Sequence, residues 1–315
     1  MEKYSRWRDA STGIQPFLPP VPPRTDASLL VTLSNVVHWT VGPLQGSIKL
    51  ILISLVSVVY VLLNGLSVLL TPLGPLKRAW HTLYSTLLIR LILFLMGFFY
   101  IKKETVSIRK SRTHGVSPHV HHGDVIIANW TSYVDILYLA YRFNPVFTQI
   151  YTDTNKVRMI SLWEAIQLTH TSPASSGHGL YTLEELANKA KQHKWGPVVV
   201  FPEGTTTNGR ALLKFAPVFT DCHIDASRYH IMAFKYEYGT MSPTFTVGSL
   251  LMHLFRLCSQ FHNTLIVKQL ASFEPLGELS DALTTSLGHL AKLRKTNLAL
   301  TDKREFLSFY HSKRK

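Results

Sequence analysis

Residues 50 to 70, "LILISLVSVVYVLLNGLSVLL", contain no charged residue, and most of them are apolar. A helix that is apolar on all sides must be buried, either in a large protein core or in lipid. At about 1.5 Å per residue, a helix of this length matches a hydrocarbon core of about 30 Å. The stretch therefore predicts a membrane-inserted helix.

A second apolar stretch follows at 82–101, after a break "TPLGPLKR" with two prolines and a glycine. Arg90 interrupts it, and a charge that faces lipid costs at least a few kcal/mol. The second stretch can therefore pair with the first as a hairpin, or lie shallow with Arg90 extended to the surface. We predict a membrane-inserted hairpin over 46–103, and the alternatives of two full spans or a buried globular helix pair stay open.

Charge and composition favour a membrane partner. Charged residues make up 17% of the chain, against about a quarter in soluble proteins, and the net charge is +14. Basic chains favour anionic partners, but no zinc-finger, RNA-recognition or KH pattern is present. We predict a phospholipid membrane as partner and no nucleic acid. The basic segment "KKETVSIRKSR" after the second apolar stretch predicts that the domain beyond it faces the cytosol.

Cysteine and histidine positions give no sign of a metal site. The two cysteines, Cys222 and Cys258, form no CxxC pair and fit a reducing compartment. The histidines of "HVHH" at 119–122 have no second ligand cluster at useful spacing, which favours a solvated loop. We therefore predict no metal.

The chain divides into four parts: a polar, proline-rich arm at 1–45, the hairpin, an α/β domain at 104–275, and a helical basic tail at 276–315. Period-2 and buried β-branched runs predict strands at 124–129, 146–152, 196–201, 230–238 and 263–270, and helical spacing predicts helices at 132–143, 180–192 and 245–262. This alternation predicts a mostly parallel sheet flanked by helices.

Two motifs follow apolar strands, "NWTSYVD" at 129–135 and "VVVFPEGTTTNGR" at 198–210. Loops at the carboxyl ends of strands in an open α/β sheet converge on one crevice. We therefore expect Asp135 to face the same site as the Glu203–Thr205 loop.

These motifs resemble those of the glycerolipid acyltransferase family. The first family motif, Asn-His-x-Ser-x-x-Asp, is matched at Asn129, Ser132 and Asp135, but Trp130 stands where the family has histidine. The family motif Phe-Pro-Glu-Gly-Thr is matched without gaps at 201–205. The likeness covers about residues 105–275, and the opening "MEKY" with "TGI" and "PFLP" resembles fungal members that act on lysophosphatidic acid at the endoplasmic reticulum and lipid droplets.

The resemblance implies an acyl-CoA-dependent acyltransferase that converts lysophosphatidic acid to phosphatidic acid in phospholipid and triacylglycerol synthesis. Acyl-CoA would be a co-substrate, and no cofactor is expected. The implied catalytic residues are Asp135 and Glu203. The implied substrate-binding residues are Ser132, Gly204, Thr205, Asn208 and Arg210. Glycine after Glu203 lets backbone amides approach a phosphate or an oxyanion, and Thr205 with Asn208 fits a Thr-x-x-Asn variant in the lysophosphatidylcholine branch.

Trp130 raises the question of what replaces the base, because an indole nitrogen is a donor only. Asp135 could act directly or through water, although an aspartate here could also cap a helix. Another histidine could be brought in: His121 and His122 lie at the far end of the preceding strand, whereas His170 and His178 stay open. The remaining alternative is a non-catalytic lipid-binding protein on the same fold.

Overall fold

The computed structural model describes residues 4–21, 29–69, 71, 73–107, 119–174, 176–220, 222–275 and 277–313, with side chains from 39 onward in the first long helix. Parts of the predicted arm (1–3 and 22–28), of the predicted basic flank (108–112) and of the C-terminal tail (314–315) lie outside the described residues.

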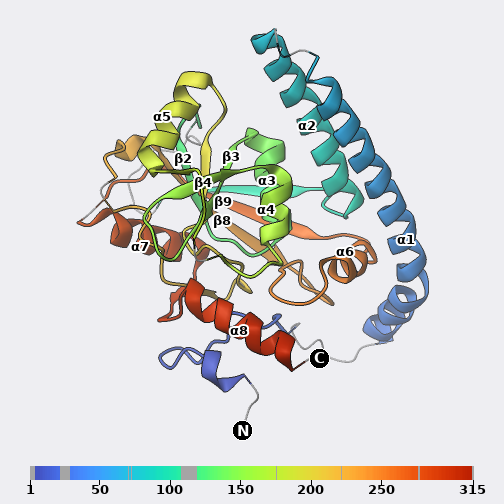
Figure 1. Cartoon of the computed structure of the whole chain (residues 1–315). Helices are drawn as coiled ribbons and strands as arrows, with labels where there is room; N and C mark the ends of the chain where they lie inside the picture. Colours follow the sequence, from blue (N-terminus) through green and yellow to red (C-terminus); the bar gives the residue numbers. More distant parts are fainter. Residues whose placement is uncertain are drawn as a thin grey trace.

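An eight-stranded sheet forms the centre of the molecule, in the order β1-β9-β8-β2-β6-β3-β4-β5 (Figure 1). Its strands are β1 Ile101–Val106, β2 Val125–Ala128, β3 Val146–Ile150, β4 Val157–Ile160, β5 Leu180–Tyr181, β6 Val198–Val200, β8 Tyr229–Glu237 and β9 Thr264–Leu270. The pairs β1–β9, β8–β2, β2–β6 and β6–β3 are parallel, and the pairs β8–β9, β3–β4 and β4–β5 are antiparallel. The predicted α/β fold with a mostly parallel sheet is confirmed.

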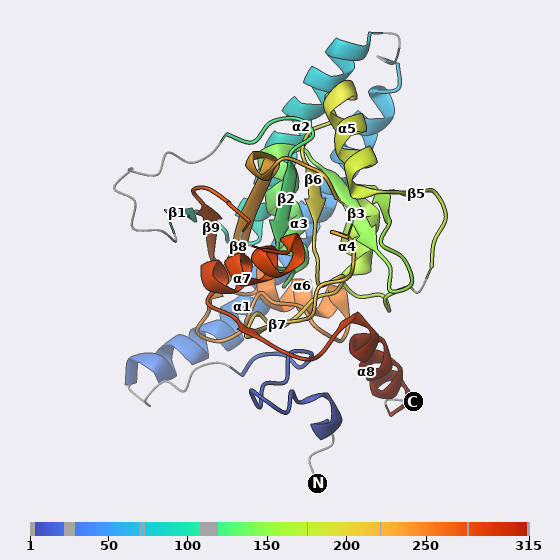
Figure 2. The same ribbon diagram turned by 90° about the vertical axis from the view of Figure 1, so that its left-hand side faces the viewer.

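Helices cover both faces of the sheet, because alternate side chains of its central strands are apolar on both sides. In β2, Ile126 and Ala128 join the core shared with α3, whereas Val125 and Ile127 join the core beneath α5 and α7. The helices of the first face are α2 Gly74–Leu95, α3 Tyr133–Phe143, α4 Leu162–Leu168 and α6 Leu250–Cys258, and those of the second are α5 Leu183–His193 and α7 Leu279–Ala291. Figure 2 shows these layers from the side.

The N-terminal apolar segment forms two long antiparallel helices, α1 (Leu29–Leu66) and α2, that lie along one side of the α/β domain (Figure 1). The stretch Trp39–Leu66 of α1 is long and apolar enough to cross a membrane, and 11% of its apolar window is buried. Arg78 near the tip of the hairpin donates to the carbonyl of His193 at 2.7 Å. The hairpin thus rests on the domain at its tip as well as at its base.

The hairpin differs from its predicted limits for local reasons. The first helix begins at Leu29, inside the predicted arm, with Pro43 within it. The second helix begins at Gly74, because Pro75 is compatible with a first helical turn, and it ends at Leu95 before Gly97, which has φ +93°. Arg90 donates to the carbonyls of Phe98 and Phe99 at 2.9 and 2.7 Å, so its charge is held by backbone beyond the helix end.

Segments near both ends of the chain pack against the α/β domain. The segment predicted as a helical basic tail forms α7, which packs on β8 and β9, and α8 (Leu300–Ser312). Small elements are η1 Ser5–Trp7, η2 Ala226–Arg228 and the pair β7 Ala211–Leu212 with β10 Arg294–Lys295. The arm and α8 share an apolar cluster in which Trp7, Phe17 and Phe306 are buried, and Figure 2 shows both beneath the sheet.

Candidate functional site

The two motifs lie side by side at the carboxyl ends of β2 and β6, two central strands of the sheet. β2 and β6 are parallel neighbours, with Val125 opposite Val198, so the segments that leave them lie side by side. The indole of Trp130 stacks on the ring of Phe201 with centroids 4.8 Å apart, and Thr207 N–H donates to the carbonyl of Trp130 at 3.0 Å. One local site therefore contains both motifs.

Asp135 is fully buried and closes the first turn of α3. Its Oδ2 accepts hydrogen bonds from Thr131 N at 2.8 Å, Thr131 Oγ1 at 2.9 Å and Ser132 N at 2.9 Å, and its Oδ1 accepts one from the Tyr236 hydroxyl at 2.5 Å. Burial raises the pKa of Asp135 to about 6, against the lowering effect of these donors. Both oxygens are therefore committed to the protein, which fits a positioning role better than proton abstraction.

Ser132 and Asn129 also fix backbone. Ser132 is the N-cap of α3, accepting from Val134 N at 3.2 Å, and its hydroxyl donates to the Pro243 carbonyl at 2.7 Å. The Asn129 amide exchanges two hydrogen bonds with the backbone of Phe234, at 3.1 and 2.8 Å. The matched members of the first motif thus tie β2 and α3 to β8 and its following loop.

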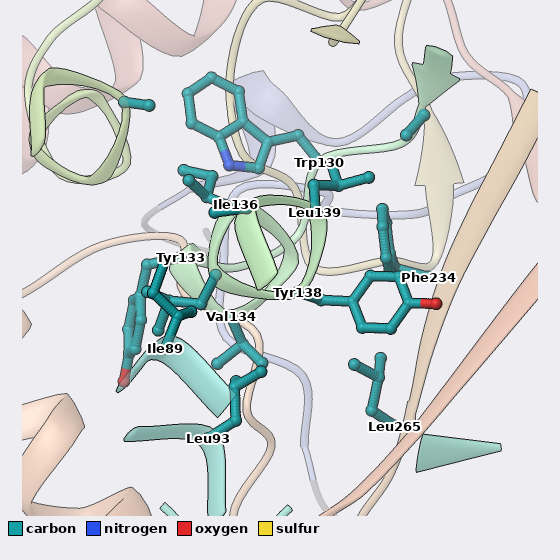
Figure 3. Packing of buried hydrophobic residues seen from close by; sticks show 14 of the residues in the cluster. Ile89, Leu93, Trp130, Tyr133, Val134, Ile136, Tyr138, Leu139, Phe234 and Leu265 are labelled. Atoms are coloured by element: carbon teal, nitrogen blue, oxygen red, sulfur yellow. The ribbon is translucent and has the colours of Figure 1, made fainter. Parts of the chain in front are cut away.

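Trp130 occupies the position of the family histidine as a packing residue. It is 5% exposed and belongs to the same apolar cluster as Ile136 and Leu139 of α3 (Figure 3). Its indole nitrogen is buried without a hydrogen-bond partner. The ring borders a small cavity together with Leu168 and Gly204.

Glu203 is buried under the loop that it begins. Its Oε2 accepts from Leu213 N at 2.9 Å, while Oε1 has no hydrogen-bond partner. Burial raises the pKa of Glu203 to about 8, so the carboxyl is mainly protonated at neutral pH. Gly204 follows with φ +64°, and a Cβ there would lie 3.0 Å from Leu300 Cδ2, so the turn requires glycine.

The remaining predicted substrate residues lie where the loop meets the arm. Thr205 is buried. The side-chain amide of Asn208 donates to the carbonyls of Gln15 at 2.8 Å and Leu18 at 3.0 Å, and Arg210 donates to the carbonyl of Val21 at 3.0 Å. In this structure Asn208 and Arg210 bind the N-terminal segment, and their substrate contacts stay a prediction.

Lys303 of α8 was not predicted. It is 1% exposed, and its Nζ donates to the carbonyls of Thr206 at 3.3 Å and Thr246 at 2.7 Å. Burial lowers the pKa of Lys303 to about 7. A lysine in a basic C-terminal segment is expected to be solvated. Nothing in the sequence therefore indicated that Lys303 binds the backbone of the motif loop.

A large apolar cleft lies beside the motifs, between the hairpin and the domain. Its volume is about 1270 Å³, larger than the several hundred Å³ of an ordinary small-molecule pocket. The lining comes from α1 and α2 on one side and from α3, α4 and the start of α6 on the other, and includes Ile53, Ile92, Leu137, Ile166 and His170. The predicted arrangement of hairpin and domain gave no indication of this space.

Comparison with known proteins agrees with the motifs. Residues 105–236 match the family model described as Acyltransferase. A candidate lysophosphatidic acid:oleoyl-CoA acyltransferase of Schizosaccharomyces pombe is 31% identical over 246 residues, which cover 75% of this chain and 73% of that protein. The chain belongs to the glycerolipid acyltransferase family. Two Arabidopsis thaliana proteins named Lysophospholipid acyltransferase, LPEAT1 and LPEAT2, are 27% and 24% identical, and the matches cover 75% and 65% of this chain and 64% and 35% of theirs.

No solved structure matches the chain. Family membership rests on sequence, and the fold agrees with it, because the matched range runs from β1 to β8 and contains both motifs.

Proposed function

We propose that this family member is an acyl-CoA-dependent lysophospholipid acyltransferase that converts lysophosphatidic acid to phosphatidic acid, and so supplies glycerolipid and triacylglycerol synthesis. The observation that carries the proposal is the apolar cleft, which Tyr133 of the first motif helps to line. A cleft of about 1270 Å³ walled by aliphatic side chains suits a fatty acyl chain, because burial of each methylene is favourable by about 0.8 kcal/mol. The name of the S. pombe relative supports the choice of head group and donor.

The membrane side of the proposal rests on the outer surface of the hairpin. Large apolar side chains of α1 and α2 point away from the domain, among them Leu55, Leu62 and Leu87, each at least 60% exposed. An exposed apolar surface of this extent fits contact with lipid. We propose that the protein lies at the endoplasmic reticulum membrane and the lipid-droplet surface, with the α/β domain in the cytosol. The net charge of +14 of the whole chain favours an anionic leaflet.

Within the site, we assign Asp135 and Ser132 to positioning of the first motif, and Glu203 to support of the loop through Leu213. Gly204 borders the cavity beside Trp130 and is our proposal for close approach of backbone to substrate.

A non-catalytic lipid-binding protein is the second candidate, and one observation favours it. Trp130 stands in place of the family base and cannot accept a proton, while Asp135 is already saturated with donors. Such a protein would bind lysolipid in the same cleft without turnover.

Acyl transfer by detergent-purified protein, with oleoyl-CoA and a panel of lysophospholipids, separates the two. Ile92→Trp fills the cleft, and Leu91→Trp places the same ring at a neighbouring position that does not line it. Turnover on lysophosphatidic acid that is lost in Ile92→Trp and retained in Leu91→Trp would support the enzyme. Absence of turnover in the wild type, with lysolipid binding that Ile92→Trp abolishes, would support the second candidate instead.

A further inference from the structure

The reaction proposed above needs a group that takes the proton from the lysolipid hydroxyl. Trp130 has no lone pair to offer, Asp135 accepts four hydrogen bonds within the protein, and Glu203 is held mainly in its protonated form by burial. None of the three predicted motif positions is thus a free base at neutral pH.

Among the histidines whose side chains the structure describes, His81 and His170 line the apolar cleft. His81 lies within 3.2 Å of the side-chain nitrogen of Asn144, the residue that ends α3. The 11 residues of α3 rise about 16 Å, so His81 is at the end of α3 remote from the motif.

A third histidine, His253, lies behind the wall of the cleft with both ring nitrogens engaged. Its Nδ1 is 3.0 Å from the Tyr133 hydroxyl and its Nε2 is 3.1 Å from the Thr244 carbonyl. The carbonyl can only accept, so Nε2 carries the proton and Nδ1 accepts from tyrosine. Burial lowers the pKa of His253 to about 4, which disfavours proton uptake.

His170 differs from His81 in its position near the motifs and from His253 in its exposure to the cleft. It is exposed, it lines the cleft, and it follows α4 where that helix touches both motifs. Leu168 borders the small cavity with Trp130, and the Thr169 carbonyl accepts from the Thr206 hydroxyl at 3.5 Å. His170 therefore lies at the cleft and directly follows the residue whose backbone contacts the loop of the second motif.

We propose that His170 is the general base of this enzyme, supplied from outside the family motif; the inference rests on the proposed function. The imidazole takes the hydroxyl proton while the lysolipid oxygen bonds to the thioester carbonyl carbon. The carbon–sulfur bond then breaks, and the thiolate of coenzyme A leaves with the proton that the imidazolium returns. The products are the ester and free coenzyme A, and His170 is regenerated. A carboxylate of the same cleft, Glu164, is paired with Arg158 at 2.8 Å and so is not a free competitor.

The test compares wild type, His170→Ala and His178→Ala in acyl transfer from oleoyl-CoA to lysophosphatidic acid, between pH 5.5 and 8.5. His178 is the matched control, since it is exposed on the same connection and does not line the cleft. We expect kcat of His170→Ala to fall about 100-fold or more with little change in KM, and the acidic limb of the pH profile to disappear. His178→Ala should match the wild type.

Two further measurements separate a base from a structural residue. Added imidazole should restore turnover to His170→Ala, because it supplies a base at the emptied position. Trp130→His in that background should restore turnover without imidazole, because it returns a base to the position of the family motif. Active wild type with an unchanged rate and pH profile in His170→Ala would overturn the assignment, as would a loss that neither addition restores. Wild type without turnover would overturn the proposed function itself.

Discussion

Replacement of Asp135 by alanine should lower the stability of the folded protein, apart from any effect on activity. Alanine removes the acceptor for three buried donors, Thr131 N–H, Ser132 N–H and Tyr236 O–H. Each donor left without an acceptor costs about 1–3 kcal/mol, or about 3–9 kcal/mol together. Removal of a carboxylate whose pKa burial raises from 3.8 to about 6 returns about 3 kcal/mol at neutral pH. The net loss of unfolding free energy is about 3 kcal/mol.

Thermal unfolding in detergent, followed by tryptophan fluorescence, measures this loss. A change of about 3 kcal/mol corresponds to a fall in Tm of about 6–12 °C for a domain of this size. Inactivity of Asp135→Ala would then say nothing about chemistry. A melting temperature within 2 °C of the wild type would refute the reasoning, because the hydrogen bonds from these three donors would then carry no net stability.

Asp135→Asn is the matched control for this experiment. The amide keeps an oxygen for the backbone donors and can donate to Tyr236, so the expected loss is smaller. The raised pKa means that folded protein keeps the proton between pH 3.8 and about 6 while unfolded protein loses it. Wild-type stability therefore falls as pH rises through this window, by up to about 1.4 kcal/mol per pH unit, and the asparagine variant lacks that contribution.

Three further variants test the surroundings of the motif loop. Glu203→Gln should remove a decline in stability between pH 4.5 and about 8, because the folded state holds a proton there that the unfolded state has lost. Denaturant titrations across this range measure how the free energy of unfolding changes with pH. An equal pH dependence in both proteins would contradict the prediction. Lys303→Met should remove a rise in stability between pH 7 and about 10, where folded protein binds fewer protons than unfolded, and the same titrations detect it. Asn208→Ala frees two arm carbonyls and should cost about 1–3 kcal/mol in thermal unfolding, against under about 0.5 kcal/mol for the exposed control Asn188→Ala.

Local sequence patterns correctly predicted the strands and helices whose own residues have a clear periodicity or cap. The β-branched runs of β2 and β6, and the capped, amphipathic α3 and α5, lie within a few residues of their predicted limits. Strand β1 was missed because it is an edge strand with two consecutive exposed lysines in "IKKETV", and these were interpreted as the basic flank of a membrane segment. The prolines of the break predicted a turn correctly, but Pro75 sits in the first turn of α2, where its missing N–H costs nothing.

Long-range contacts explain what the sequence did not predict about the site. The amide of Asn208 reaches Gln15, and Lys303 reaches Thr206, across most of the chain. No spacing rule links residues so far apart. The sequence therefore predicted an extended arm and a solvated C-terminal tail. The same limit applied to His170, whose place at the cleft follows from the packing of α4 against the second motif.

The residues of the first motif that this chain shares with the family all make structural hydrogen bonds. Asn129 joins β2 to β8, Ser132 caps α3, and Asp135 accepts from the backbone before α3 and from the Tyr236 hydroxyl of β8. These contacts stabilise the fold whether or not the protein turns over substrate. Trp130, at the position of the family histidine, stacks on Phe201 and makes no side-chain hydrogen bond. Retention of the motif therefore does not establish catalysis in this chain, and its loss at Trp130 does not exclude it. Under the proposed function, the base is a residue that lies at the apolar cleft and can accept a proton, and the proposed His170 meets both conditions.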